Sequence, residues 1–192
     1  MSEIYIGTKF KYINKGSKIS KNNNLILLKK WCNIFNENNF APSYPGGSSG
    51  NLSFRIKKNN FIITASHTAL KKDMNESDFA EVIFCSVENN IVEAIGSKEP
   101  SSEALMHYLI YENRADVNAV YHGHSNEIMK LAKQKGFPET KTEFDYGTIE
   151  LAKEVVKTLK KHNFVILKNH GFVSVGKTQE YTGTQVLNFI KF

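Results

Sequence analysis

The feature that most constrains this chain is His122-Gly123-His124, which ends a β-branched and aromatic run. Side chains at alternate positions of a strand point to the same face, so the two imidazoles can converge on one metal ion while Gly123 faces away without bulk. A third histidine, His170, ends a second apolar run. Three imidazoles leave one coordination position open, which is the pattern of catalytic rather than structural zinc sites.

Any one of these histidines, taken alone, is more simply explained as a hydrogen-bonded core residue. Both apolar runs end in histidine, which is unusual, and in both a glycine is next to the imidazoles. This repetition favours a shared site. The remaining histidines, His67, His107 and His162, lack such a setting. We expect them to be structural or surface residues.

Length and composition favour one globular domain over residues 1–192, with residues 1–20 as an N-terminal arm or edge segment. The formal charge of +6 comes almost entirely from scattered lysines, because only Arg55 and Arg114 are arginines. Without a clustered basic footprint, we expect no nucleic-acid partner. The first 15 residues hold no continuous apolar run, so we expect a cytoplasmic protein with no membrane partner.

Apolar periodicity and turn residues predict helices and short strands in an alternating order. The predicted helices are 24–38, 101–113, 126–134, 149–161 and one from 178, and the predicted strands are 52–56, 60–64, 81–87, 91–95, 119–123, 164–168 and 172–175. Many of the strands are close in sequence and therefore suited to antiparallel pairing. The pattern indicates a mixed α/β sandwich with a largely antiparallel sheet.

Two further segments carry groups that suit an anion. The loop from Gly46 to Asn51 offers consecutive backbone N–H groups, hydroxyls and an amide. Ser101, Ser102 and Glu103 open a predicted helix, where N–H groups and the helix dipole favour negative charge. Taken alone, however, these segments are more simply explained as a flexible turn and an ordinary helix cap.

The order of these motifs resembles the class II aldolase/adducin family over about residues 25 to 185. The resemblance is carried by Gly47–Ser53, Phe61–Thr64, Pro100–Glu103, His122–Ser125, Tyr146–Thr148 and Asn169–Gly171. Family members include fuculose-phosphate and rhamnulose-phosphate aldolases, ribulose-5-phosphate 4-epimerase and methylthioribulose-1-phosphate dehydratase. The resemblance implies a three-layer α/β/α sandwich with a largely antiparallel central sheet, commonly assembled as a homotetramer.

The resemblance also implies roles for individual residues. It makes His122, His124 and His170 the ligands of one Zn²⁺ per chain, Glu103 the acid/base, and Ser48, Asn51, Ser101 and Ser102 the groups that hold a substrate phosphate. These roles describe a lyase that acts on a small phosphorylated or anionic keto sugar through a metal-stabilised enediolate. A dehydratase, decarboxylase or 4-epimerase on the same metal site remains an alternative, and so does a non-catalytic adducin-like binding module.

The chain departs from the family pattern at three places that bear on the substrate. The segment between His124 and Tyr146 is shorter than in typical sugar-phosphate aldolases. The phosphate loop usually reads Thr-Pro-Ser/Thr-Gly, whereas Thr64-Ala65-Ser66-His67 stands here. Only 22 residues follow His170, too few for the C-terminal tail whose tyrosine assists the sugar-phosphate aldolases. We therefore expect either that the anion differs from that of the family pattern or that it binds in a different way.

Overall fold

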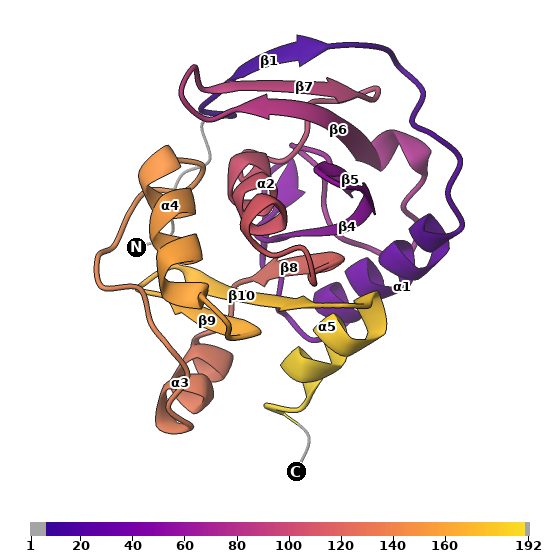
Figure 1. Cartoon of the computed structure of the whole chain (residues 1–192). Helices are drawn as coiled ribbons and strands as arrows, with labels where there is room; N and C mark the ends of the chain where they lie inside the picture. Colours follow the sequence, from indigo (N-terminus) through magenta and orange to yellow (C-terminus); the bar gives the residue numbers. More distant parts are fainter. Residues whose placement is uncertain (1–6, 191–192) are drawn as a thin grey trace.

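The computed structural model describes residues 7–190, and its central feature is an eight-stranded sheet with helices on both faces (Figure 1). The strands are β1 (Lys11–Asn14), β4 (Asn51–Lys57), β5 (Asn60–Thr64), β6 (Phe79–Ser86), β7 (Ile91–Ile95), β8 (Ala119–Gly123), β9 (Phe164–Leu167) and β10 (Gly171–Gly176). Their order is β1-β7-β6-β5-β4-β8-β10-β9, and each pairing is antiparallel except that of β1 with β7. The predicted strands are therefore confirmed, and β1 adds an edge strand.

Within residues 7–190, five α-helices cover the two faces of this sheet. They are α1 (Asn24–Glu37), α2 (Ala104–Asn113), α3 (Asn126–Gln134), α4 (Ile149–Leu159) and α5 (Gln179–Leu187). Helices α2 and α4 pack against each other over one face, and α1, α3 and α5 contact the strands from the other (Figure 1). This arrangement confirms a three-layer α/β/α sandwich with a largely antiparallel central sheet.

Two hydrophobic cores, one on each face, follow from the alternation of side chains along the strands. On β8, Val120 belongs to the core under α2 and α4, whereas Tyr121 belongs to the core under α1 and α5. Because strand side chains alternate, His122 shares the face of Val120. The same alternation therefore directs this histidine towards the N-terminal end of α2.

The structure differs from the predicted elements at two places near the site. Helix α2 begins at Ala104 rather than Ser101, and no side chain caps it. Residues 99–101 instead pair with the chain at the end of β5: Pro100 forms a β-bridge with Ala65, and the Ser101 N–H donates to the Thr64 carbonyl. The predicted loop from Gly46 to Asn51 contains the short strand β3 (Gly47–Ser48), which pairs with β2 (Ser43–Tyr44) in a small hairpin.

Residues 1–6 of the expected N-terminal arm lie outside the described residues. Within 7–190, none of the helices combines the length and the apolar character that crossing a membrane requires. The part of the chain that matters for the site is the region where β4, β8 and the β9–β10 turn meet α2.

Candidate metal centre and active site

The structure brings the three predicted histidines together at the end of β8. His122 Nε2 lies 2.9 Å from His124 Nε2 and 3.3 Å from His170 Nε2. The possible ligand atoms of all three lie within 4.8 Å of one another. Two nitrogens bound to one tetrahedral zinc lie about 3.3 Å apart, so these separations suit a single ion.

The local sequence explains why the imidazoles converge. His122 and His124 follow the alternation of β8, and Gly123 between them faces the opposite core, as expected. A Cβ at Gly123 would lie 2.6 Å from the Phe172 ring and 2.9 Å from the Phe40 carbonyl oxygen, so no larger residue fits without a shift. The spacing of the two histidines therefore depends on glycine.

Hydrogen bonding and burial prepare His122 to bind a metal. Its Nδ1 lies 2.9 Å from the Phe172 carbonyl oxygen, which can only accept, so Nδ1 carries the proton and Nε2 offers its lone pair. Burial is the main cause that lowers the pKa of His122, and burial also holds the pKa of His124 well below its usual value. Neutral imidazoles are the form that ligates metal ions.

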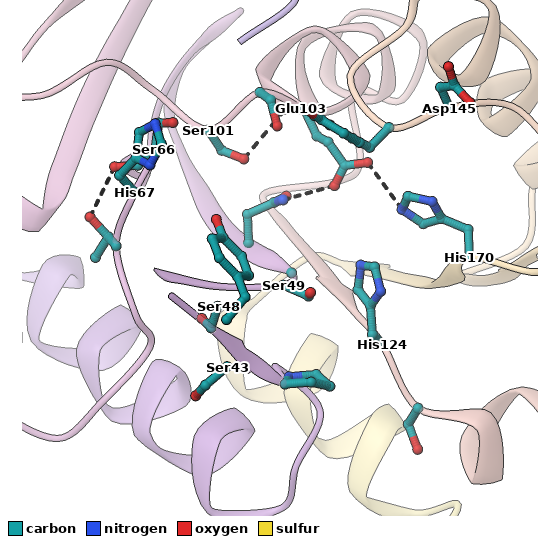
Figure 2. A pocket seen from close by; sticks show the side chains of 18 of the residues that line it. Ser43, Ser48, Ser49, Ser66, His67, Ser101, Glu103, His124, Asp145 and His170 are labelled. Atoms are coloured by element: carbon teal, nitrogen blue, oxygen red, sulfur yellow. Dashed lines mark hydrogen bonds and ion pairs between the residues drawn. The ribbon is translucent and has the colours of Figure 1, made fainter. Parts of the chain in front are cut away.

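Glu103 places a carboxylate next to these rings (Figure 2). Its Oε2 lies 3.0 Å from His122 Nε2 and accepts a hydrogen bond of 2.9 Å from Asn51 Nδ2. Its Oε1 lies 3.4 Å from His170 Nε2 and is buried without a hydrogen bond from any residue in 7–190. An orphaned carboxylate oxygen that faces three imidazoles is a position that a cation would satisfy.

The electrostatics of the cluster support the same conclusion. Burial alone would raise the pKa of Glu103, but positive charge at His122 and His170 and the hydrogen bond from Asn51 outweigh it, so this pKa lies well below its usual range. The ionised carboxylate of Glu103 thus requires positive charge nearby, whereas burial favours the neutral form of the imidazole rings. A divalent ion meets both requirements at once, so the residues present fit a metal.

The cluster opens into a cavity of about 920 Å³. The cavity wall includes all four residues expected to hold a phosphate, which are Ser48, Asn51, Ser101 and Ser102, together with Glu103, His124 and His170. Ser48 Oγ accepts a hydrogen bond from the Leu70 N–H and so links its own hairpin to the segment that carries Leu70. The structure therefore brings every predicted site residue into one region.

His67 also lines this cavity, at the position where the family pattern has glycine. Its side chain is exposed and its φ is +50°, in the left-handed region that glycine adopts most easily. The backbone therefore takes the shape expected of glycine even though an imidazole is attached.

Sequence reasoning missed part of the site. His107, expected to be structural or surface, is completely buried and lies within hydrogen-bonding distance of Asn51 and Ser53. The signal that could have found it is its place four residues after Glu103 on one helix, which puts both on the same face. Tyr44, Glu143 and Asp145 line the cavity and were not singled out either.

Comparison with known proteins agrees with this geometry. The family model Class II Aldolase and Adducin N-terminal domain matches residues 30–187. The chain is 33% identical over 182 residues to an L-fuculose phosphate aldolase of Methanococcus maripaludis, an alignment that covers 86% of this chain and 93% of that protein. It is also 33% identical over 163 residues to an L-fuculose phosphate aldolase of Methanococcus vannielii, covering 77% and 84%. The solved structure of an L-fuculose 1-phosphate aldolase has a TM-score of 0.69 at 25% identity and covers 90% of this chain and 83% of that one. The chain therefore belongs to the class II aldolase and adducin N-terminal domain family, as an aldolase-type lyase.

Proposed function

We propose that this protein is a zinc-dependent aldolase that cleaves a small phosphorylated or otherwise anionic keto sugar. The observation that carries the proposal is the convergence of three imidazoles, one buried and two partly buried, with the buried Oε1 of Glu103 that lacks a hydrogen bond, at one cavity. Three neutral nitrogens form a borderline-soft site that suits zinc, with one ion per chain. The aldolases among its relatives support the reaction type.

His122, His124 and His170 would hold the ion. Bound there, zinc would supply a Lewis acid that stabilises the negative charge developing on the carbonyl side of the substrate. In the cleavage direction one carbon–carbon bond breaks, a hydroxyl loses its proton to become an aldehyde, and the other fragment gains a proton on carbon. The lowered pKa of Glu103 keeps its carboxyl group ionised, so in cleavage it would take up the proton that the hydroxyl loses and deliver a proton to carbon, with no net gain or loss. In the reverse direction it would remove the proton from carbon.

Ser48, Asn51, Ser101 and Ser102 supply the donors for the anionic end of the substrate. The Asn51 amide nitrogen has two hydrogens, and donating one to Glu103 leaves the other for a ligand. The serines are largely buried but line the cavity, which suits hydroxyls that meet a phosphate rather than bulk water. The family resemblance further supports a homotetramer. Sedimentation velocity would measure the mass of the assembly.

The proposal is tested with the purified protein, stripped with a chelator and reloaded with zinc. We expect about one zinc per chain and zinc-dependent release of dihydroxyacetone phosphate from L-fuculose 1-phosphate or another ketose 1-phosphate. His170→Ala should abolish both, whereas His162→Ala, an exposed histidine outside the site, should retain them.

Three results would contradict parts of the proposal. Full zinc occupancy in His170→Ala would remove this residue from the ligand set. Zinc binding with carbon dioxide or water release instead of aldehyde would favour a decarboxylase or dehydratase, and binding without turnover would favour a non-catalytic module.

A further inference from the structure

A continuous series of buried polar contacts runs from Glu103 into the core between α2 and β4. Asn51 Nδ2 donates to Glu103 Oε2 at 2.9 Å, and Asn51 Oδ1 lies 2.7 Å from His107 Nε2. On the other side of the ring, His107 Nδ1 lies 2.7 Å from Ser53 Oγ, which in turn lies 2.7 Å from the Tyr111 hydroxyl. All five residues are at most 4% exposed.

This series arises because two rows of side chains face each other. His107 and Tyr111 are one turn apart on α2, and Asn51 and Ser53 alternate onto one face of β4. Phe61 on β5 stacks on the imidazole, with ring centroids 6.4 Å apart and an interplanar angle of 23°. The ring of His107 therefore has a fixed plane as well as fixed partners.

Chemistry fixes the direction of each hydrogen bond. An amide nitrogen can only donate to the Glu103 carboxylate, so the Asn51 oxygen must face His107 and can only accept. His107 Nε2 therefore carries a proton. Burial lowers the pKa of His107 to about 3, so the ring is neutral near pH 7 and its Nδ1 is an acceptor. Ser53 must then donate to Nδ1, and the Tyr111 hydroxyl must donate to Ser53.

We propose that His107 is a positioning residue, whose Nε2–H holds the Asn51 amide with its N–H directed at Glu103 and so fixes the carboxylate for proton transfer. This inference rests on the proposed function in taking Glu103 as the proton-transfer group. If Asn51 turned its amide over, its oxygen would face the carboxylate and its N–H would face another donor. His107 therefore favours the orientation that the reaction uses.

Two variants separate positioning from general support of the core. The amide nitrogen of Gln is four bonds from Cα, as is His Nε2, whereas the amide nitrogen of Asn is three bonds away, as is His Nδ1. His107→Gln thus keeps a donor for Asn51, and His107→Asn keeps only a partner for Ser53. His162→Asn serves as the matched surface control.

For cleavage, we expect kcat to fall by no more than about fivefold in His107→Gln but by about 100-fold in His107→Asn, because a misplaced reacting group slows the chemical step. KM should be nearly unchanged in both variants. Equal losses of kcat in the two variants, or a loss confined to KM, would overturn the positioning role.

Nitrogen-15 NMR provides a readout that needs no activity. In the wild-type protein we expect His107 as the neutral Nε2–H tautomer and the Asn51 side-chain amide protected from hydrogen exchange. The protection should persist in His107→Gln and be lost in His107→Asn. An Nδ1–H tautomer in the wild-type protein, or unchanged protection of the Asn51 amide in His107→Asn, would overturn the inference. Both results hold whether or not the wild-type protein cleaves a ketose phosphate. If His107→Asn does not fold, the tautomer in the wild-type protein alone decides the matter.

Discussion

At the scale of single residues, the site depends on which nitrogen of each buried imidazole carries the proton. His122 donates through Nδ1 to the Phe172 carbonyl, which leaves Nε2 for a metal. His107 is held in the opposite tautomer because an amide oxygen faces its Nε2. In each case an oxygen that can only accept determines the tautomer, so the roles of the two histidines differ although both are fully buried.

Glu103→Gln tests the proposed acid/base at this scale. The amide keeps the shape of the side chain but cannot accept a proton, so we expect kcat for ketose-phosphate cleavage to fall at least about 100-fold while zinc is retained. Steady-state kinetics together with metal analysis measure both effects. Undiminished turnover would assign the proton transfer to another residue, and loss of the folded state would give Glu103 a structural role instead.

At the scale of elements, close packing between helices on the α1 face depends on one glycine. A Cβ at Gly183 on α5 would lie 2.3 Å from two carbons of the Trp31 ring on α1. Gly183→Ala should therefore destabilise the protein by about 1–2 kcal/mol, since an overpacking cost of up to about 3 kcal/mol outweighs the gain in helix propensity of about 1 kcal/mol. Urea unfolding measures the change, with the exposed Thr184→Ala on the same helix as control. Unchanged stability in Gly183→Ala would mean that α5 can shift away from α1.

The turn before β6 carries a pH-dependent contribution to stability. Burial alone would raise the pKa of Asp78, but hydrogen bonds from Lys98 and the Asn75 backbone, at 2.8 and 2.9 Å, outweigh it and lower this pKa. A carboxyl with a lowered folded-state pKa stabilises the fold above its ordinary pKa of about 4, and this stabilisation is lost as the pH falls through the folded-state pKa.

Asp78→Asn should therefore cost about 1–2 kcal/mol at pH 7, a value reduced by solvent screening because the Lys98 side chain is 39% exposed. The difference from the wild-type protein should shrink towards pH 3 in urea unfolding. Exposed Asp73→Asn is the control. A difference that stayed constant with pH would show that the ionised form contributes nothing.

At the scale of the whole molecule, the sheet gathers residues that are more than a hundred positions apart in the chain. Strand β8 pairs with β4 on one side and β10 on the other, so Asn51, His122 and the turn that carries His170 lie together. Helix α2 covers this junction and brings Glu103 to it. A metal ion bound here would therefore join segments from across the fold.

Zinc should accordingly raise the melting temperature of the protein. An ion that binds only the folded state at 100 times its Kd contributes about 2.7 kcal/mol. Differential scanning calorimetry with and without a chelator measures the shift, which should vanish in His124→Ala and persist in His162→Ala. An equal shift in both variants would place the stabilising ion elsewhere.

The sequence by itself determined the layered α/β class, most strands and helices, and several residues of the candidate site, although it missed His107. Alternation along β8 and helical periodicity in α1 are local patterns, so they can be read without the rest of the chain. The same reasoning placed the start of α2 at Ser101, whereas the helix begins at Ala104, because residues 99–101 pair with the distant end of β5 through the Ala65–Pro100 bridge.

Only the tertiary structure decided how those residues meet. The orphaned oxygen of Glu103, the buried place of His107 and the left-handed backbone at His67 all result from contacts between segments distant in sequence. Burial and hydrogen-bond partners are properties of the packed chain, and they set the tautomer and the charge of each group. Residue types and spacing therefore indicated which groups form the site, whereas packing decided the chemical state in which each one is held.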